Sequence, residues 1–344
     1  MVKLSIIIPY HNESNELIFP LYQSLNYQMG INWDDIEIIV SNNCDIPDDK
    51  TEFFAQFENI KNRIKYIPGP KGSWMGQNRQ NGLRIARGEY VIFIDSDDQM
   101  NSSVSLLTVL NAIKSNDDMY SSRIIQDHLT WNRGSVINAF PEDIPPTNLV
   151  LHGKIYKRKW LVENNLYFCP YIRAYEDLYF NWLAFVIADS KWVYVDTPFY
   201  YWKTRLDSTG RAMGTAVDDY CNYYNEDSFI YMYYANMRLK LNGELSEEFK
   251  GAIHMSIVTI YNQRYRIAGT LDYADHIAGL ILKEFDVPVD KLLSDSSIVN
   301  SPDIKFADWI DRIMQVDVEW VKKHYNIRDI DAENPYKRGE MMPV

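Results

Sequence analysis

A run of acidic residues directly follows one hydrophobic segment of the chain, and its spacing suits metal binding. The segment Tyr90–Ile94 is apolar, and Asp95-Ser96-Asp97-Asp98 comes immediately after it. Carboxylates that are packed together repel one another unless a cation lies between them. Mg²⁺ and Mn²⁺ bind oxygen ligands, commonly one or two carboxylates together with substrate phosphates. The sequence thus offers candidate ligands for Mn²⁺ or Mg²⁺, and a solvated turn with helix-capping aspartates is the alternative.

Strands and helices alternate over the first 100 residues, and this alternation must position the acidic run. We predict strands at 4–9, 37–40, 64–67 and 90–94, and helices at 16–28, 51–62 and 77–87, with Gly88 as the glycine that ends the last helix. Such alternation predicts an α/β fold with an open, mostly parallel sheet. Ligands bind at the carboxyl ends of the strands of such sheets. We therefore expect the residues after the first, second and fourth strands to face one cleft.

The rest of the chain divides into a mixed part and a helical part. We predict strands at 149–156, 192–195 and 198–202, a helix that ends near Asn164, and an apolar helix at 177–188. After about residue 215, amphipathic helices are predicted at 219–241, 246–268, 271–284 and 305–324, with a loop at 294–303. We therefore expect three parts, which comprise residues 1–100, 101–215 and a helical C-terminal module at 216–344.

Composition excludes several classes of protein. The chain has 344 residues, of which 46% are hydrophobic, and a formal net charge of −12. The hydrophobic content is too high for an intrinsically disordered chain. The negative net charge argues against nonspecific binding to nucleic acid or to an anionic membrane. The three cysteines lack metal-ligand spacing, and no run of 18 apolar residues occurs in the sequence. The short apolar run near residue 4 does not resemble a signal peptide, so we expect none. We expect a cytoplasmic protein without a transmembrane segment, and peripheral attachment at the inner membrane face stays open.

Five segments together resemble the family 2 glycosyltransferases of the GT-A fold, the bacterial surface-glycan type included. The segments are Ser5–Glu13, Glu37–Asn43, Asn78–Leu83 with Ala86–Tyr90, Asp95–Asp98 and Tyr175–Phe180. The resemblance covers residues 3 to about 205 and implies a nucleotide-diphospho-sugar transferase fold. It makes residues 1–100 the nucleotide-sugar-binding half of the GT-A domain and residues 101–215 the acceptor-binding half. The helices beyond 215 have no counterpart in the shared core.

The resemblance also implies which residues hold the donor. Asp97 would bind the metal ion, and Asp95 would reach either the ribose or the metal. Asn42 stands where the family often has an aspartate that accepts the uracil N3–H. An asparagine carbonyl can accept that bond too, so a UDP-sugar remains the expected donor. The donor-binding residues implied are Pro9, His11, Glu13, Asn42, Arg79, Asp95, Asp97, His152, Lys203, Arg205 and Ser208.

The acidic pair Glu176-Asp177 resembles the family's acceptor-side motif. Alone, such a pair is typical of the acidic first turn of a helix. The resemblance implies instead that Asp177 is the general base and that Glu176 positions it or contacts the acceptor. The family inverts the anomeric centre, so one carboxylate must take the proton of the attacking acceptor hydroxyl.

These observations predict a metal-dependent inverting glycosyltransferase. We expect a nucleotide-sugar donor and a glycan or lipid-linked glycan acceptor, as in bacterial surface polysaccharide synthesis. We expect no nucleic acid partner, and the C-terminal helices offer a surface for homo-oligomer formation. The alternatives are a non-catalytic sugar-nucleotide or glycan-binding protein of the same fold, and an aspartate-nucleophile phosphatase. The phosphatase is disfavoured because its Asp-x-Asp motif normally follows the first strand.

Overall fold

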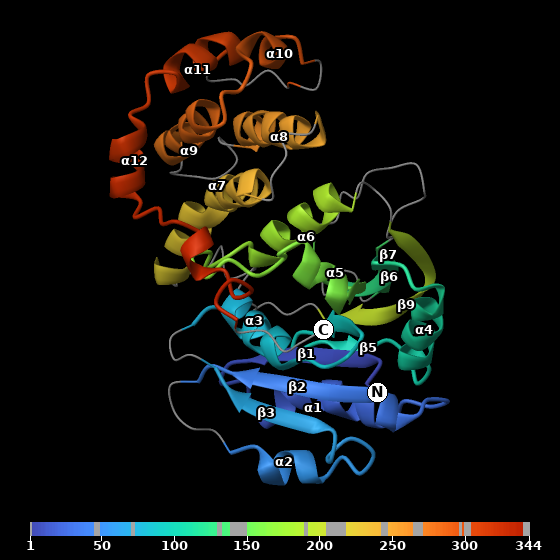
Figure 1. The fold of residues 1–344 in the computed structure, drawn as a ribbon. Helices are drawn as coiled ribbons and strands as arrows, with labels where there is room; N and C mark the ends of the chain where they lie inside the picture. The colour runs from blue at the N-terminus through green and yellow to red at the C-terminus, as the bar shows by residue number, and fades with distance from the viewer. Residues whose placement is uncertain are drawn as a thin grey trace.

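A mixed β-sheet with helices on both faces forms the centre of the molecule, and further helices are stacked beyond one of those faces (Figure 1). The computed structural model describes residues 2–44, 49–69, 73–128, 133–137, 150–188, 192–203, 218–241, 247–263, 271–295, 298 and 304–339. No helix within these residues is long and apolar enough to cross a membrane.

The sheet joins strands from the first 202 residues. Its strands are β1 (Leu4–Tyr10), β2 (Ile36–Asn42), β3 (Ile64–Pro68), β4 (Tyr90–Phe93), β5 (Gln99–Met100), β6 (Met119–His128), β7 (Arg133–Ile137), β8 (Lys154–Lys157) and β9 (Val193–Trp202). Their order is β3-β2-β1-β4-β8-β6-β9-β5, and β7 pairs with β6. The strands β3, β2, β1 and β4 are mutually parallel, so their carboxyl ends lie at one edge as predicted. Beyond β4 the pairing is antiparallel except between β6 and β9.

The helices fall into two sets. Those associated with the sheet are α1 (Asn15–Asn26), α2 (Thr51–Ala55), α3 (Met75–Ile85), α4 (Ser105–Ala112), α5 (Arg158–Glu163) and α6 (Glu176–Ile187). Those of the C-terminal helical region are α7 (Asp218–Leu241), α8 (Glu247–Gln263), α9 (Leu271–Glu284), α10 (Val289–Leu293), α11 (Phe306–Ile313) and α12 (Val318–His324). Short 3₁₀ helices occur at Trp33–Asp35, Ile113–Ser115 and Asp331–Glu333.

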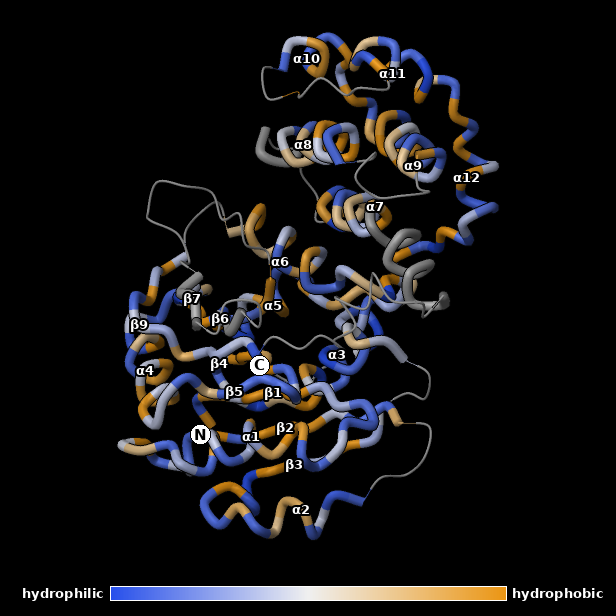
Figure 2. The backbone as a smooth tube through the Cα atoms, turned by 180° about the vertical axis from the view of Figure 1, so that it is seen from behind, coloured by the Kyte–Doolittle hydropathy of each residue, from blue (hydrophilic) through white to orange (hydrophobic). Residues whose placement is uncertain are grey.

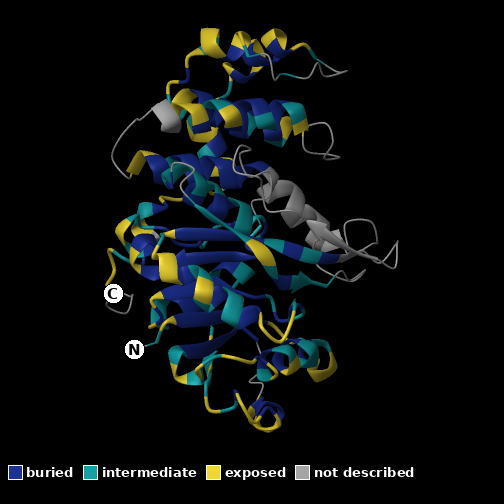
Figure 3. Cartoon of the chain, turned by 90° about the vertical axis from the view of Figure 1, so that its right-hand side faces the viewer, coloured by how far each residue is buried: buried dark blue, intermediate teal, exposed yellow. Residues whose placement is uncertain are grey.

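Alternation along the strands divides the core between the two faces of the sheet. Ile6 and Ile8 of β1 belong to a cluster that includes the apolar residues of α1 and α2, whereas Ile7 belongs to a second cluster. The second cluster continues without a break through Phe180 of α6 into the helices of the C-terminal region, including Ile281 of α9. The strands β1, β2 and β4 are correspondingly buried along their whole length, in the part of the sheet that is mainly dark blue in Figure 3 and largely hydrophobic in Figure 2. The C-terminal helical region therefore shares one hydrophobic core with the sheet.

Two predicted elements of the first half differ in the structure. The helix predicted at 51–62 ends at Ala55, where the Phe57 N–H donates to the carbonyl of Phe54 in a tighter turn. The Asn26 side chain then accepts the Asn59 backbone N–H at 2.9 Å. Gly88 does not end α3, which stops at Ile85. Its small size serves a close approach instead, since a Cβ there would lie 2.5 Å from the Ser5 nitrogen.

Further along the chain, the boundaries of several predicted elements were wrong. The strand predicted at 149–156 begins only at Lys154, after a turn in which Gly153 has a φ of +71°. The two strands predicted between 192 and 202 form the single strand β9, and β6 and α4 were not predicted. The helix predicted at 305–324 is two helices, because the Asp317 side chain accepts the Trp320 N–H and starts a new helix there.

Candidate functional site

The segments that follow β1, β2 and β4 are hydrogen-bonded to one another, as the parallel strand order predicts. His11 Nδ1 lies 2.9 Å from Asn43 Oδ1, which joins the segment after β1 to the segment after β2. The Ser96 hydroxyl donates to Glu13 Oε1 at 2.9 Å, which joins the segments after β1 and β4. Burial raises the pKa of Glu13, and the charge of Asp97 raises it further. The structure therefore brings these predicted donor residues together.

Pro9 and Asn42 lie at the ends of the paired strands β1 and β2. Pro9 faces Ser41 in the register of the two strands. Asn42 is buried, its side-chain carbonyl accepts the Cys44 N–H at 2.8 Å, and its amide donates to the Tyr66 hydroxyl at 2.5 Å. The orientation of the Asn42 amide is thus fixed by its own chain. A carbonyl oxygen has two lone pairs, so the Asn42 carbonyl can accept one bond more.

Asp95, Asp98 and His152 form a cluster that could hold a metal ion. Their ligand atoms all lie within 4.8 Å of one another, and His152 Nε2 is 3.4 Å from Asp95 Oδ2 and 3.7 Å from Asp98 Oδ2. The other ring nitrogen, Nδ1, is buried and has no hydrogen-bond partner among the described residues. Asp97, the residue that we predicted as the main ligand, is outside this cluster of described residues.

The charges within this cluster favour a bound cation. Burial raises the pKa of Asp98 well above its usual range, and the neighbouring carboxylates of Asp97 and Asp95 raise it further. Burial acts in the same sense on Asp95, but Arg79 and His152 hold the pKa of Asp95 well below its usual range. A divalent cation would relieve the repulsion among these carboxylates, and carboxylate oxygens with one imidazole are an acceptable ligand set for Mn²⁺. The residues present therefore fit a divalent ion.

Arg79 connects this cluster to the acidic pair at the start of α6. Its guanidinium is buried, donates to Asp95 Oδ1 at 2.7 Å, and also donates to Glu176 Oε1. Burial by itself would lower the pKa of Arg79, but the two carboxylates raise it above its ordinary value. We predicted that Arg79 approaches the nucleotide, and the structure gives its guanidinium two protein carboxylates as partners.

Asp177 lies in the first turn of α6, next to Glu176. One of its oxygens accepts the backbone N–H of Leu178 at 2.8 Å. Burial raises the pKa of Asp177 to about 7, the charge of Glu176 raises it too, and Arg79 opposes both. A carboxylate with a pKa near 7 is well matched to proton transfer at neutral pH.

The family comparison agrees with this arrangement. The model of the family "Glycosyl transferase family 2" matches residues 5–177, which is half of the chain. The chain belongs to glycosyl transferase family 2. The matched residues include every segment discussed above, from the end of β1 to the acidic pair of α6, so the resemblance found in the motifs is confirmed.

Two curated relatives of this chain are named for their activity. The poly(ribitol-phosphate) β-N-acetylglucosaminyltransferase TarS of Staphylococcus aureus is 28% identical over 267 residues, which cover 74% of this chain and 43% of that protein. A poly(ribitol-phosphate) β-glucosyltransferase of Bacillus spizizenii is 31% identical over 238 residues, which cover 65% of this chain and 35% of that protein. The chain thus spans less than half the length of these relatives.

Solved structures confirm the GT-A fold class. A crystal structure of S. aureus TarS residues 1–349 in complex with UDP has a TM-score of 0.60 at 17% identity, and covers 98% of this chain and 92% of that chain. The mannosyltransferase PcManGT of Pyrobaculum calidifontis, in complex with GDP-Man and Mn²⁺, has a TM-score of 0.54 at 14% identity. The match covers 95% of this chain and 88% of that chain.

Three residues of the site were missed in the sequence. Tyr200 donates to Asp98 Oδ2 at 2.5 Å and accepts the Asp95 N–H at 3.2 Å, and the His152 ring packs against Tyr200 and Trp202. Asp98 was visible as the last member of the acidic run but was not selected. The period-two spacing of Tyr200 and Trp202 on β9 was the signal that both rings face the same side.

The first residue after β9, Lys203, is hydrogen-bonded to Asp98 of the cluster of Asp95, Asp98 and His152. The Lys203 backbone N–H donates to Asp98 Oδ1 at 2.8 Å, so the end of β9 is tied to the acidic run. Arg205 and Ser208, which we predicted as phosphate contacts, lie outside the described residues.

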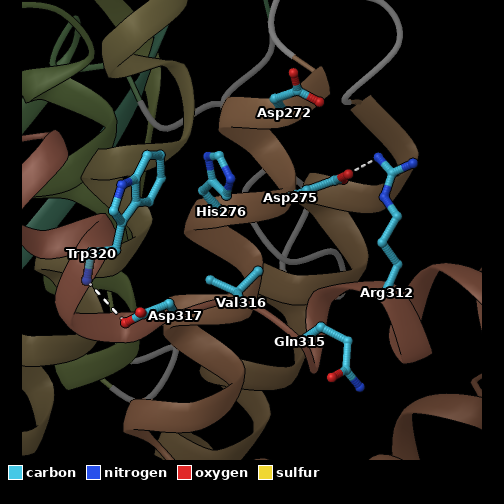
Figure 4. Close-up of a pocket in the computed structure, with 8 residues that line it drawn as sticks. All are labelled: Asp272, Asp275, His276, Arg312, Gln315, Val316, Asp317 and Trp320. Atoms are coloured by element: carbon cyan, nitrogen blue, oxygen red, sulfur yellow. Dashed lines mark hydrogen bonds and ion pairs between the residues drawn. The ribbon is translucent and has the colours of Figure 1, made fainter.

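A separate pocket of about 280 Å³ lies in the C-terminal helical region, between α9, α11 and α12 (Figure 4). Its lining residues are Asp272, Asp275, His276, Arg312, Gln315, Val316, Asp317 and Trp320. Asp275 is paired with Arg312, and Asp317 accepts the backbone N–H of Trp320. Because these groups already have protein partners and none belongs to the five family segments, we do not assign the donor to this pocket.

Proposed function

We propose that the protein is a metal-dependent, inverting glycosyltransferase that transfers a sugar from a UDP-sugar to a hydroxyl group of a surface-glycan acceptor. The observation that carries the proposal is the link through Arg79. One buried guanidinium contacts both Asp95 of the metal-binding cluster and Glu176, the neighbour of Asp177. A site for a leaving diphosphate and a candidate base are thereby held together, as a single displacement requires.

On the donor side, residues at the carboxyl ends of β1 and β2 and in the segment after β1 would line the nucleotide. Pro9, His11 and Glu13 would contact the base and ribose, and Asn42 would accept the uracil N3–H with its carbonyl. Crystal structures of S. aureus TarS residues 1–349 in complex with UDP and with UDP-GlcNAc support uridine as the nucleoside. The sugar of the present donor is left to experiment.

The diphosphate would lie beside the metal-binding cluster. Asp95, Asp98 and His152 would hold a divalent ion, with Asp97 as the further carboxylate that the family motif supplies. A bound divalent ion would stabilise the negative charge that develops on the leaving diphosphate. The Mn²⁺ complex of the P. calidifontis mannosyltransferase supports this assignment. Lys203, Arg205 and Ser208 remain proposed phosphate contacts.

On the acceptor side, Asp177 would accept the proton of the attacking hydroxyl. Its pKa of about 7 makes it both partly ionised and basic enough at neutral pH. Glu176 would keep Arg79 in place and thereby fix the first turn of α6. The hydroxyl oxygen then attacks C1 from the face opposite the diphosphate, which inverts the configuration of that carbon.

The acceptor is proposed from the relatives. Both curated enzymes act on poly(ribitol-phosphate), a phosphate-linked polyol polymer. We propose an acceptor of the same chemical class, a hydroxyl-rich surface polymer or its lipid-linked precursor. The protein has a net charge of −12, so an anionic polymer would have to be met by local basic groups or by the metal ion.

A panel of nucleotide sugars tests the proposal. The protein would be incubated with UDP-glucose, UDP-GlcNAc, UDP-galactose and GDP-mannose, with Mn²⁺ or EDTA, in the presence and absence of polymeric ribitol phosphate. Mass spectrometry would follow the donor and the polymer. We expect donor-selective, Mn²⁺-dependent transfer, with slow donor hydrolysis when the acceptor is omitted. Binding of a donor without hydrolysis or transfer would identify a non-catalytic binding protein instead.

A further inference from the structure

Tyr175, the residue before the acidic pair, has an unusual backbone conformation. It is the residue that caps the start of α6, and its φ and ψ of 64° and 23° place it in the left-handed region. That region is unfavourable for a bulky residue other than glycine, asparagine or aspartate. Such a conformation persists only where the surrounding structure holds it. Some contact must therefore maintain the backbone of Tyr175.

The C-terminal helical region supplies such a contact. Tyr231 of α7 stacks on the Tyr175 ring, with ring centroids 5.9 Å apart and planes inclined by 30°. Tyr231 is buried, and α7 runs beside α6 (Figure 1). Burial raises the pKa of Tyr231, and the neighbouring Tyr175 and Asp177 raise it further.

Contacts with α3 restrict the position of Glu176 on the other side of the acidic pair. Glu176 is held by Arg79, and a Cβ at Gly76 of α3 would approach the Glu176 side chain to 3.0 Å. The carbonyl of Tyr175 accepts the Tyr179 N–H at 3.0 Å, the first backbone bond of α6. A change in the Tyr175 torsions would thus rotate the first turn of α6 and move the Asp177 carboxylate with it.

We propose that Tyr231 is a positioning residue, through which the C-terminal helical region fixes the start of α6 and orients Asp177 toward the acceptor. The inference rests on the proposed function, because it assumes that Asp177 is the base. It gives the helices beyond residue 215 an indirect part in catalysis, in addition to any role in acceptor binding or self-association.

Three variants test this role. Tyr231→Ala removes the stacked ring, Tyr231→Phe keeps the ring and removes only the hydroxyl, and Tyr233→Ala is the matched control. Tyr233 is buried on the same helix, but its ring packs against Tyr234 and Phe285 and not against Tyr175. The measurements are kcat and KM for the donor, calorimetry with UDP and Mn²⁺, and hydrogen–deuterium exchange of the peptide that contains residues 175–182.

We expect Tyr231→Ala to lower kcat about 10–100-fold, the usual cost of a misplaced reacting group, with the donor KM and UDP affinity unchanged. Tyr231→Phe should retain nearly normal kcat, because the stack remains. Tyr233→Ala should lower Tm but leave kcat per folded molecule close to that of the wild type. Amide exchange at the start of α6 should increase in Tyr231→Ala alone.

Two outcomes would overturn the inference. Equal loss of kcat in Tyr231→Ala and Tyr233→Ala would indicate a general effect on stability, and unchanged kcat and exchange in Tyr231→Ala would show that the stack does not hold α6. Failure of the proposed function can be distinguished from failure of this inference, since the wild type would then transfer no sugar at all. The exchange experiment still decides the positioning role in that case.

Discussion

Replacement of Asp177 by asparagine separates the proposed base from a simple helix cap. Asparagine has nearly the same shape and keeps an oxygen that can accept the Leu178 N–H, which now lies 2.8 Å from Asp177. It cannot take a proton from the acceptor. We therefore expect the transfer rate to fall about 10²–10⁴-fold, which corresponds to about 3–5 kcal/mol of transition-state stabilisation. UDP affinity should change little.

The pH dependence follows from the same residue. The pKa of Asp177 is raised to about 7, mainly by burial, so the ionised base is lost as pH falls below about 7. The wild-type rate should then fall about tenfold for each further pH unit, and the residual rate of Asp177→Asn should lack this limb.

The stability of the fold should change in the opposite direction. A raised carboxyl pKa means that the folded state binds this proton more tightly than the unfolded chain does, so the contribution of Asp177 to stability declines as pH rises from about 4 to about 7. A displacement of about three pKa units corresponds to at most about 4 kcal/mol, and solvent near this partly exposed side chain reduces that figure. We expect Asp177→Asn to raise Tm by about 2–4 °C above pH 7, with no gain near pH 4.

Initial rates with the natural acceptor, measured from pH 5 to pH 9, are the assay. Asp272→Asn is the matched control, since it makes the same change in the first turn of α9, in the C-terminal helical region. Glu176→Gln should cost less than Asp177→Asn. Near-normal turnover of Asp177→Asn together with an inactive Glu176→Gln would exchange the two roles, and activity in both would leave the acidic pair as a helix cap.

Four further substitutions have defined outcomes. Asp97→Ala and Asp98→Ala should each abolish Mn²⁺-dependent UDP binding in calorimetry, and undiminished affinity in either would remove that residue from the metal site. Asn42→Asp should preserve or strengthen UDP binding, because a carboxylate can accept both the Cys44 N–H and the uracil N3–H. A sharp loss of UDP affinity at constant Tm would refute the contact between residue 42 and the uracil. Gly88→Ala should lower Tm and leave donor KM unchanged, because its Cβ would meet the Ser5 nitrogen at 2.5 Å.

Local sequence patterns determined the parallel half of the sheet. The apolar runs that became β1, β2 and β4 are buried on both faces, and their carboxyl ends had to meet at one edge once the strands were parallel. The position of the acidic run at that edge followed directly. The start of α6 was also predictable to within one residue, because a pair of acidic residues precedes an apolar helical segment.

Elements whose extent or pairing depends on residues far away in the chain could not be predicted. The helix predicted at 51–62 stops at Ala55, and Asn26, from another helix, binds the backbone of Asn59 in the segment that follows. The strand β6 was missed because its pairing with both β8 and β9 is decided by long-range contacts. Local propensity is a weak guide where tertiary hydrogen bonds compete with it.

By itself, then, the sequence determined the chemistry available to this protein: an acidic run after a buried strand, and an acidic pair at a helix start. Only the tertiary structure decided which of these groups meet. It joined Asp95 to Glu176 through the buried Arg79, placed His152 against Asp98, and set Tyr231 of α7 on Tyr175. The physical reason is that a charged group or an aromatic ring that is removed from water needs compensating contacts inside the protein. Those contacts come from strands and helices that are far apart in the chain.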